Sequence, residues 1–558
     1  MHDPKSPMSI ADQPAVEVAD MRSEVLWPSI PAMLRTVARK RGDGIAISGE
    51  SGATHSAEGT SQPDQVSWTE LVERVDEAAR ALIASDLKAG ERAAIWAPNS
   101  LEWIVAALAI TSAGGVLVPI NTRFKGGEAA YLLERSRARV LFTVRGFLDT
   151  DYPALLAESG KSLPDLAHRV LIEGGAKDDE VGWDAFQKRA TNVSAEDLAA
   201  RVATVGPDDP CDVVFTSGTT GNPKGVVMSH GQTLRAYLDW CDWADLREGD
   251  RYLIANPFFH IFGYKAGCLA CLMRGATIYP MAVFDPGKAL EIIERERITV
   301  FPGAPTIYHS LLEHPDLETR DISSLRLAVT GAADIPVELI RRVSERLPFD
   351  RILTGYGLTE AGTVSGSHPD DDFEHIASTA GVPWSGFEVR TLAEDGSEVG
   401  IDAPGEVAVR GPTVMRAYFD DPEATAEAID AEGWLHTGDL GVFDADGYLK
   451  IVGRIKDMFI VGGFNAYPAE IENILLDHPA IGQVAVVGIP DERMGEVGAA
   501  FVVCEGGSSP ATDEIIEWSR GKMANYKVPR RIEFVDELPI NATGKIVKDE
   551  LRNRLTNA

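Results

Sequence analysis

A glycine-rich stretch near the middle of the chain constrains the fold more than any other feature of the sequence. Residues 216–225 read TSGTTGNPKG, and short apolar runs lie on either side, at 213–215 and 226–228. Glycine and hydroxyl side chains in one loop leave backbone N–H groups available to surround an anion. The stretch therefore predicts a strand-loop-strand unit whose loop binds phosphate.

This loop differs from the phosphate loop of common nucleotide kinases. The Walker pattern, G-x-x-x-x-G-K-[ST], is followed by a helix. Here Lys224 follows Pro223 and precedes Gly225, and the next residues are typical of a strand. A P-loop kinase or ATPase is disfavoured, and the loop alone leaves open a ligand-free hairpin rich in small residues.

The composition excludes other classes of function. The chain has 558 residues, room for several domains, and a formal net charge of -32. Nucleic-acid surfaces need clustered Lys and Arg, so we expect no nucleic-acid partner. The start lacks a secretory signal, and the five cysteines are a sparse, odd set that indicates a reduced cytoplasm. Cys268 and Cys271 lie in an apolar stretch, which favours core packing over metal or redox use.

One uncharged run, residues 103–120, is long enough to suggest a membrane span. Thr111, Gly114 and Pro119 interrupt it. We therefore expect a buried helix followed by a buried strand, and no integral membrane segment.

Helical and strand patterns alternate through the first part of the chain. Ser67 to Glu70 has the spacing of a capping box before an amphipathic helix, and residues 92–97 read as a buried strand. Ser100 precedes a second helix, and a second strand is expected at 116–119. This rhythm predicts an α/β fold of parallel sheets with helices on their faces, in which ligands lie beyond the carboxyl ends of strands.

Several later strand ends carry small or reactive groups. His260 follows the expected strand 252–255 amid aromatic residues, a setting in which core packing is the commoner role. Tyr356 offers a flat face, and Glu360 lies just beyond it. A hard carboxylate oxygen suits magnesium on a triphosphate, although a solvated turn glutamate is the alternative.

The pattern of expected secondary structure changes toward the end of the chain. Residues 381–416 read as β-rich, and Asp439 is expected in a turn, with its carboxylate toward a ribose diol. Alternating helix and strand patterns from residue 458 onward predict a compact α+β unit of about a hundred residues. Its last feature is Lys545, on a glycine turn.

Five motifs together resemble the adenylate-forming acyl-CoA synthetase (fatty-acid–CoA ligase) superfamily. They are TSGTTGNPKG, YGLTE (356–360), WLHTGD (434–439), GRIKDMFIVGGFNAYPAEIE (453–472) and PINATGK (539–545). Their order and spacing cover the chain from about residue 30 to 555. The resemblance implies a cytoplasmic ligase with a carboxylic acid, Mg-ATP and coenzyme A as substrates, which forms an acyl-adenylate and then acyl-CoA, AMP and pyrophosphate.

The resemblance also implies the domain plan. Residues 1–30 form a lead-in, 31–453 a large domain of α/β subdomains with a β-rich subdomain, 454–457 a hinge, and 458–558 a small mobile α+β domain. Rotation at Lys456 withdraws Lys545 and brings Gly462 and Gly463 to a tunnel for the pantetheine arm of coenzyme A. Whether the chain forms a homo-oligomer is left open.

By the same resemblance, catalytic roles fall to Lys545, Thr216, Glu360 and His260. Lys545 bridges the attacking carboxylate and the α-phosphate, and Glu360 ligates magnesium. The implied nucleotide-binding residues are Thr216, Ser217, Gly218, Thr219, Thr220, Gly221, Lys224, Gly331, Ala332, Ala333, Tyr356, Gly357, Thr359, Asp439 and Arg454. The implied acyl pocket contains His260, Tyr264, Thr306 and Gly331.

Residues 256–267 and 462–468 resemble a subgroup, the actinobacterial ligases that activate the propionate side chain of steroid-derived bicyclic rings. Medium- or long-chain fatty acids and other cyclic carboxylates remain open as substrates. Two further alternatives are an adenylating enzyme that loads a carrier protein and a non-catalytic ATP-binding scaffold. The presence of Lys545 near the tail argues against the scaffold, because a non-catalytic protein does not need this lysine.

Overall fold

The computed structural model describes residues 26–49, 64–216, 223–331, 337–461, 464–491, 493–506, 508–541 and 546–556. Part of the predicted site lies outside the described residues. These residues are Ser217, Gly218, Thr219, Thr220, Gly221, Ala332, Ala333, Gly462, Gly463 and Lys545.

A nine-stranded sheet forms the first layer of the molecule. Its central strands are parallel, as the α/β pattern predicts, while β10 and β19 join one edge in antiparallel register. In sheet order the strands are β19 (Ala417–Tyr418), β10 (Lys224–Ser229), β9 (Pro210–Thr216), β4 (Val116–Pro119), β3 (Arg92–Trp96), β5 (Ala138–Phe147), β7 (His168–Glu173) and β8 (Glu180–Gly182), with β6 (Thr150–Asp151) beside β5.

The capping signals in the sequence locate the helices of this layer. Ser67 Oγ accepts the Glu70 N–H at 3.1 Å, and Ser100 Oγ accepts the Trp103 N–H at 3.0 Å. The helices are α1 (Ile30–Arg41), α2 (Trp68–Ala84), α3 (Leu101–Ser112), α4 (Gly126–Ser136), α5 (Tyr152–Glu158), α6 (Trp183–Gln187), η2 (Lys188–Asn192), α7 (Ala195–Ala203) and α8 (His230–Trp243).

The uncharged run at 103–120 is core, as predicted. It forms most of α3, where every residue except Glu102 is buried, and then the fully buried strand β4. None of the helices in the described ranges has the length and apolar character needed to cross a membrane.

A second layer joins two four-stranded sheets through parallel bridges at Val300. Its strands are β2 (Asp64–Ser67), β1 (Ile45–Gly49), β12 (Thr277–Pro280), β11 (Arg251–Ile254), β13 (Leu327–Gly331), β14 (Arg351–Leu358), β15 (Gly362–Gly366) and β16 (Val382–Pro383). Its helices are the π-helix η3 (Phe262–Leu269), α9 (Ala270–Arg274), α10 (Pro286–Glu296), α11 (Pro305–Leu312), η4 (Pro315–Glu318), α12 (Val337–Arg346) and α13 (Phe373–Ser378).

The predicted β-rich unit is an antiparallel four-stranded sheet. It contains β17 (Glu388–Leu392), β18 (Gly405–Arg410), β20 (Leu435–Phe443) and β21 (Leu449–Arg454), while α14 (Pro422–Ala428) lies between β18 and β20 in the sequence. The short turn η5 (Ile455–Asp457) follows β21 and includes Lys456, whose side chain is exposed.

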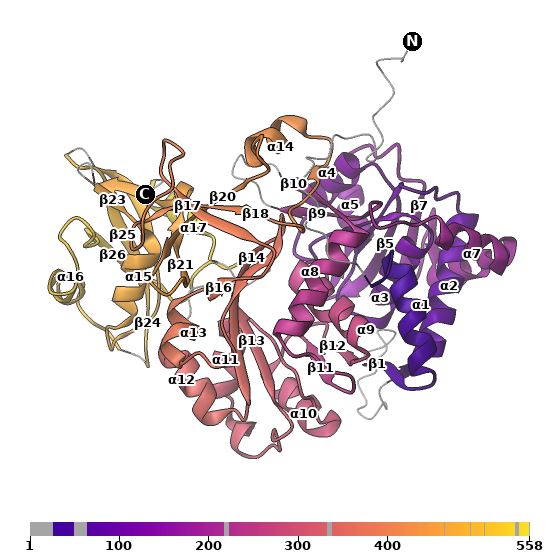
Figure 1. Ribbon diagram of the computed structural model, residues 1–558, viewed down its shortest axis with the longest axis horizontal. Helices are drawn as coiled ribbons and strands as arrows, with labels where there is room; N and C mark the ends of the chain where they lie inside the picture. Colours follow the sequence, from indigo (N-terminus) through magenta and orange to yellow (C-terminus); the bar gives the residue numbers. More distant parts are fainter. Residues whose placement is uncertain are drawn as a thin grey trace, which may run out of the picture.

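The C-terminal unit has a separate sheet and separate hydrophobic clusters. It contains β22 (Phe459–Val461), β23 (Phe464–Ala466), α15 (Pro468–Leu476), β24 (Ile481–Asp491), β25 (Gly495–Cys504), α16 (Thr512–Arg520), β26 (Arg531–Phe534) and α17 (Lys548–Thr556). Two core clusters draw only on residues from Phe459 onward. Figure 1 shows this unit at one end of the molecule, with β14 and β20 between it and the N-terminal layers. The hinge and the domain boundaries stay predictions.

Candidate functional site

Three strands bring Tyr356, Asp439 and Arg454 together. The Tyr356 hydroxyl donates a hydrogen bond to Asp439 Oδ2 at 2.6 Å, and Arg454 Nε lies 2.7 Å from Asp439 Oδ1. Asp439 and Arg454 are also direct partners in the β20–β21 ladder. Residues nearly one hundred positions apart therefore share one polar cluster, which we call the ribose triad.

Asp439 lies within strand β20, so the prediction of a turn at this position is wrong. The preceding residue, Gly438, has a φ of +68°, a conformation that favours glycine and interrupts the regular strand. Glu406 of β18 holds this irregular segment, because its Oε1 accepts the Gly438 N–H at 3.1 Å and its Oε2 lies 2.9 Å from His436 Nδ1. The glycine therefore redirects the chain inside a strand.

Burial keeps the phenol of Tyr356 protonated. The burial raises the pKa of Tyr356 well above its usual value, and the nearby Asp439 carboxylate raises it further. The phenol therefore stays protonated and donates to Asp439. A carboxylate has about four lone-pair sites, so Asp439 can accept two hydroxyls of a diol beside its present partners.

Glu360 lies next to this cluster, in the connection between β14 and β15. Its Oε1 accepts hydrogen bonds from the Tyr418 hydroxyl at 3.0 Å and from Thr216 Oγ1 at 3.5 Å. Burial raises the pKa of Glu360, with opposing effects from Tyr418 and Arg454. The end of the phosphate-loop strand β9 thus meets the carboxylate that the YGLTE motif predicts.

Tyr418 is a site residue that sequence reasoning missed. Its ring lies 5.2 Å from Lys224 Nζ, and its hydroxyl reaches Glu360. The surrounding sequence, AYFDDP, carries no signal for this role, because β19 reaches the site only through pairing with β10. Tyr418 links the cation and the carboxylate on the two sides of the predicted phosphate site.

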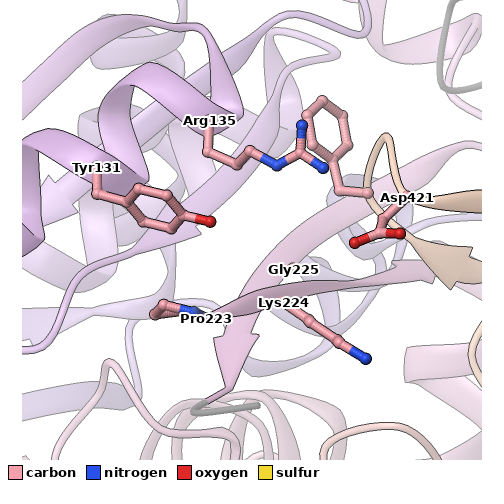
Figure 2. A pocket seen from close by; sticks show the side chains of 7 residues that line it. Tyr131, Arg135, Pro223, Lys224, Gly225 and Asp421 are labelled. Atoms are coloured by element: carbon pink, nitrogen blue, oxygen red, sulfur yellow. The ribbon is translucent and has the colours of Figure 1, made fainter. Parts of the chain in front are cut away.

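A cavity of about 230 Å³ lies beside Lys224 (Figure 2). Helix α4 contributes Tyr131 and Arg135, and the segment after β19 contributes Asp421 on the other side. Pro223, the first described residue after the loop tip, also lines it. Open space therefore reaches the exit of the glycine-rich loop.

The predicted adenine-binding residues lie at neighbouring strand ends. Gly331 ends β13, with a φ of +154°, and a Cβ there would lie 3.0 Å from the carbonyl oxygen of Gly355 on β14. This tight contact and the positive φ together favour glycine at position 331. Gly357 lies within β14, and Thr359 lies partly exposed in the turn that follows.

His260 lies between β11 and the π-helix η3. Its Nδ1 accepts the Phe262 N–H at 3.2 Å, and its carbonyl oxygen accepts the Tyr264 N–H at 3.0 Å. A neutral ring whose Nδ1 accepts carries its proton on Nε2. The sequence did not indicate the π-helix, a rare element that occurs most often at functional sites.

The other predicted acyl-pocket residues have different settings. Tyr264 is buried, with its ring centre 5.2 Å from that of Trp103, which packs equally close to Phe258. The side chain of Thr306 is exposed at the start of α11. The acyl pocket therefore stays a prediction, although His260 and Tyr264 belong to one segment.

Asn541, four residues before Lys545 in the sequence, contacts the large domain. Arg123, in the segment between β4 and α4, donates a hydrogen bond to the carbonyl oxygen of Asn541 at 3.4 Å. Helix α15 also contacts β21. The last described residue before Lys545 therefore lies against the N-terminal layers.

Comparison with known proteins gives two family matches. A model of the AMP-binding enzyme family matches residues 34–419, and a model of the AMP-binding enzyme C-terminal domain matches residues 470–545. Both matches agree with the division into a large N-terminal unit and a small C-terminal unit that the motifs and sequence patterns predict.

Two relatives share one name, that of a CoA ligase for a 3-(7a-methyl-1,5-dioxo-octahydro-1H-inden-4-yl)propanoyl group. The protein from Rhodococcus jostii is 46% identical over 528 residues, which is 94% of this chain and 98% of the relative. The protein from Mycobacterium tuberculosis is 50% identical over 486 residues, which is 87% of this chain and 93% of the relative.

Solved structures share the whole architecture. The anthranilate CoA ligase AuaEII in complex with anthranoyl-AMP is 29% identical, with a TM-score of 0.83 over 96% of this chain and 99% of that one. ATP-bound MatB from Rhodopseudomonas palustris is also 29% identical, with a TM-score of 0.81 over 95% of this chain and 99% of that one.

Proposed function

Because this chain belongs to the AMP-binding enzyme family, we propose that it activates a steroid-derived bicyclic propionate as its CoA thioester. The chain is an AMP-forming acyl-CoA ligase with ATP and coenzyme A as substrates. The relatives from Rhodococcus and Mycobacterium, whose names specify such an acid, support the substrate. The observation that carries the site assignment is the ribose triad, which joins three strands beside Glu360.

The ribose triad is suited to the nucleoside part of ATP. Asp439 accepts the ribose hydroxyls, Arg454 fixes the carboxylate, and the Tyr356 ring offers a flat face to adenine. Gly331, which has no side chain beside the backbone of Gly355, is where the base edge is proposed to approach the backbone. Ala332 and Ala333, which lie outside the described residues, are assigned to the adenine site by family resemblance alone, as is Thr359 at the α-phosphate.

Thr216, Lys224 and Glu360 are assigned to the phosphates. The described residues contain no group of three or more His, Cys, Asp or Glu side chains that could hold a metal ion. The single carboxylate of Glu360 therefore fits a Mg²⁺ ion that takes its other ligands from phosphate and water. When bound, that ion neutralises phosphate charge, while Lys224 and the loop residues 217–221 hold the terminal phosphates in place.

The first half-reaction brings two anions together. A carboxylate oxygen of the acid attacks the α-phosphorus of ATP, and the bond from that phosphorus to the bridging oxygen breaks, which releases pyrophosphate. Lys545 lies between the two anions and offsets their repulsion. The contact between Arg123 and Asn541 supports this arrangement, since it holds Asn541, four residues before Lys545, against the large domain.

The second half-reaction needs a different face of the small domain. The thiol sulfur of coenzyme A attacks the acyl carbon, and the carbon–oxygen bond to AMP breaks. Lys456 lies exposed in η5, where few side-chain contacts oppose a backbone rotation. Rotation there moves Lys545 away and brings Gly462 and Gly463 to the thiol path, beside His260 as the gate to the acyl pocket.

The five cysteines support a cytoplasmic location. All are free thiols, and four of them, Cys211, Cys241, Cys268 and Cys271, are buried. Cys268 and Cys271 pack in the core, as the sequence predicts. Reduced and sparse cysteines are typical of cytoplasmic proteins.

A panel of acids tests the substrate. The purified chain is given ATP, magnesium and coenzyme A with the indene-dione propionate named for the relatives, octanoate, palmitate and ferulate, and AMP release is measured. We expect the propionate to give a kcat/KM at least about tenfold above the others. Higher activity with octanoate or palmitate would overturn the substrate, and AMP release from none of the acids would overturn the function.

A further inference from the structure

A fully buried ion pair lies beneath the segment that carries His260. Lys265 Nζ is 2.8 Å from Asp212 Oδ2 and 2.9 Å from Oδ1, and the two side chains are only 2% and 1% exposed. None of the half-reactions above uses either residue. A buried pair of this kind is seldom more stabilising than apolar residues of the same volume, so its presence calls for another role.

The pair has hydrogen-bond partners within the core. Lys265 Nζ also donates to Thr233 Oγ1 at 3.2 Å, and Cys211 Sγ donates to Asp212 Oδ2 at 3.1 Å. Cys211 and Thr233 contact each other at 3.3 Å. Satisfied partners on both charges fix the positions of the ammonium and the carboxylate, which makes the pair a rigid connection between elements.

The elements that it connects belong to the two ends of the site. Asp212 lies in β9, four residues before Thr216, and pairs with Leu117 of β4 and Met228 of β10. Lys265 lies inside the π-helix η3, directly after Tyr264 and five residues after His260. Through this pair, the strand that leads into the phosphate loop holds the helix that follows the predicted acyl gate.

A π-helix needs such a tertiary anchor. Its wide turn is rare and persists where surrounding contacts over-determine it. In η3 the buried residues include Gly263, Tyr264, Lys265 and Cys268, but Lys265 is the only charged residue of this helix. Its ammonium has one carboxylate partner at salt-bridge distance among the described residues. Asp212 is therefore the described carboxylate that holds the one charged side chain of η3.

We propose that Asp212 and Lys265 are a positioning pair for the ligase reaction. The pair holds the π-helical register that places His260 and Tyr264 at a set distance from Thr216, so that acid and triphosphate are aligned for attack. This inference rests on the proposed roles of those three residues. Asp212 and Lys265 do not touch the substrate and act only through η3 and β9.

The test separates positioning from stability. Asp212→Leu and Lys265→Met each leave a buried charge without its partner, and we expect each to lower the apparent melting temperature by roughly 5 °C or more. The double variant Asp212→Leu/Lys265→Met removes both charges at similar volume and should melt within about 2 °C of wild type.

The double variant should have nearly the melting temperature of wild type but not its KM for the acid. With the indene-dione propionate, we expect its KM for the acid to rise about tenfold in the adenylation half-reaction, with KM for ATP unchanged. A second ion pair, Arg251 and Glu296, serves as the control: its carboxylate is largely buried, its guanidinium is partly exposed, and Arg251 lies on β11 of the other sheet. Arg251→Met/Glu296→Leu should leave both KM values unchanged.

Recovery of both the melting temperature and the acid KM in the double variant would overturn the proposal, because the pair would then be structural only. If that variant does not fold, Thr233→Val tests the positioning role instead. This substitution removes one hydrogen bond to Lys265 and leaves no unpaired charge. We expect it to raise the acid KM two- to threefold; an unchanged value would overturn the proposal. Wild type in the same assay reports on the proposed substrate separately, and the variants are then compared on whichever acid it accepts.

Discussion

The proposed nucleotide end and the proposed acyl end of this site are built in different ways. At the nucleotide end, β14, β20 and β21 hold Tyr356, Asp439 and Arg454 through polar contacts of 2.6 and 2.7 Å. At the acyl end, a single π-helix packs against Trp103, and its only charged side chain points to the core. The nucleotide end is held by direct polar contacts between side chains. The acyl end is a packed helical segment that a buried ion pair anchors.

This difference matches what each end has to recognise. ATP is the same molecule for every member of the family, and its ribose and phosphates call for fixed polar partners on rigid strands. The acid varies between ligases, and an apolar ring system is recognised mainly by shape and packing. We therefore expect substitutions at the nucleotide end to change ATP parameters and those at the acyl end to change acid parameters.

The largest expected effect comes from Lys545, the lysine proposed to bridge the acid and the α-phosphate. Lys545→Ala should lower the adenylation rate by about 10² to 10³, because no cation then offsets the repulsion between carboxylate and α-phosphate. Formation of thioester from supplied acyl-adenylate should remain close to wild type. Single-turnover assays of the two half-reactions measure both rates.

Lys456→Pro is the matched variant for the other half-reaction. It should slow thioester formation and spare adenylation, because proline stiffens the backbone at the predicted hinge. Equal losses in both half-reactions for either variant would contradict the assignment of separate roles to the two lysines.

Asp439→Asn tests whether the nucleotide end affects only the binding of ATP. The amide keeps the shape but loses the charge that faces Arg454, so KM for ATP should rise roughly 10- to 100-fold while KM for the acid stays constant. Steady-state kinetics with each substrate varied in turn measure the two values. A comparable rise in the acid KM would break the division between the two ends.

His260→Ala tests the acyl end. We expect KM for the acid to rise about tenfold with little change for ATP, because the ring orients the segment next to the acid. His260→Gln, which retains a hydrogen-bonding group, should restore part of this loss. A rise in the ATP KM alone would assign His260 to the nucleotide end instead.

The smallest expected effect is a pH dependence of stability beneath the acyl end. Burial, with Lys265 nearby, lowers the pKa of His230 to about 3, and its Nδ1 accepts the Ile30 N–H at 3.3 Å. Between pH 6.5 and 3 the unfolded chain binds a proton at this residue that the folded chain does not. Stability from His230 is therefore lost as pH falls below about 6.5, by about 2 kcal/mol at pH 5.

His230→Asn supplies the control, because its amide oxygen can accept the same N–H but does not titrate. Melting temperatures of the two proteins at pH 5 and 6.5 give the difference. If wild type and variant lose stability equally on acidification, the histidine is not buried in its neutral form.

Sequence patterns predicted much of the fold because its local signals are strong. Ser67 and Ser100 locate helix starts, and the uncharged run at 103–120 forms α3 and β4 as expected. Strand lengths and the α/β class follow from short apolar runs between these helices. The expected turn at Asp439 is wrong because the positive φ of Gly438 acts within a strand, which hydrophobic periodicity does not reveal.

The motifs also predicted candidate site residues, but they did not indicate the contacts between them. Tyr418 was missed since only the pairing of β19 with β10 brings its hydroxyl to Glu360. Asp212 and Lys265 carry no local signal either, and their attraction exists only once β9 and η3 are packed together. Such pairs depend on sequence separations of 50 residues or more.

By itself, the sequence determined the α/β class and the family, and it predicted the residues proposed to bind ATP, because these follow from local periodicity and from motifs. Tertiary structure alone decided the partners of Asp439, the position of Tyr418 between Lys224 and Glu360, and the buried ion pair of the π-helix. The physical reason is that hydrogen bonds and ion pairs between distant segments form only after the chain has folded, so no local pattern records them.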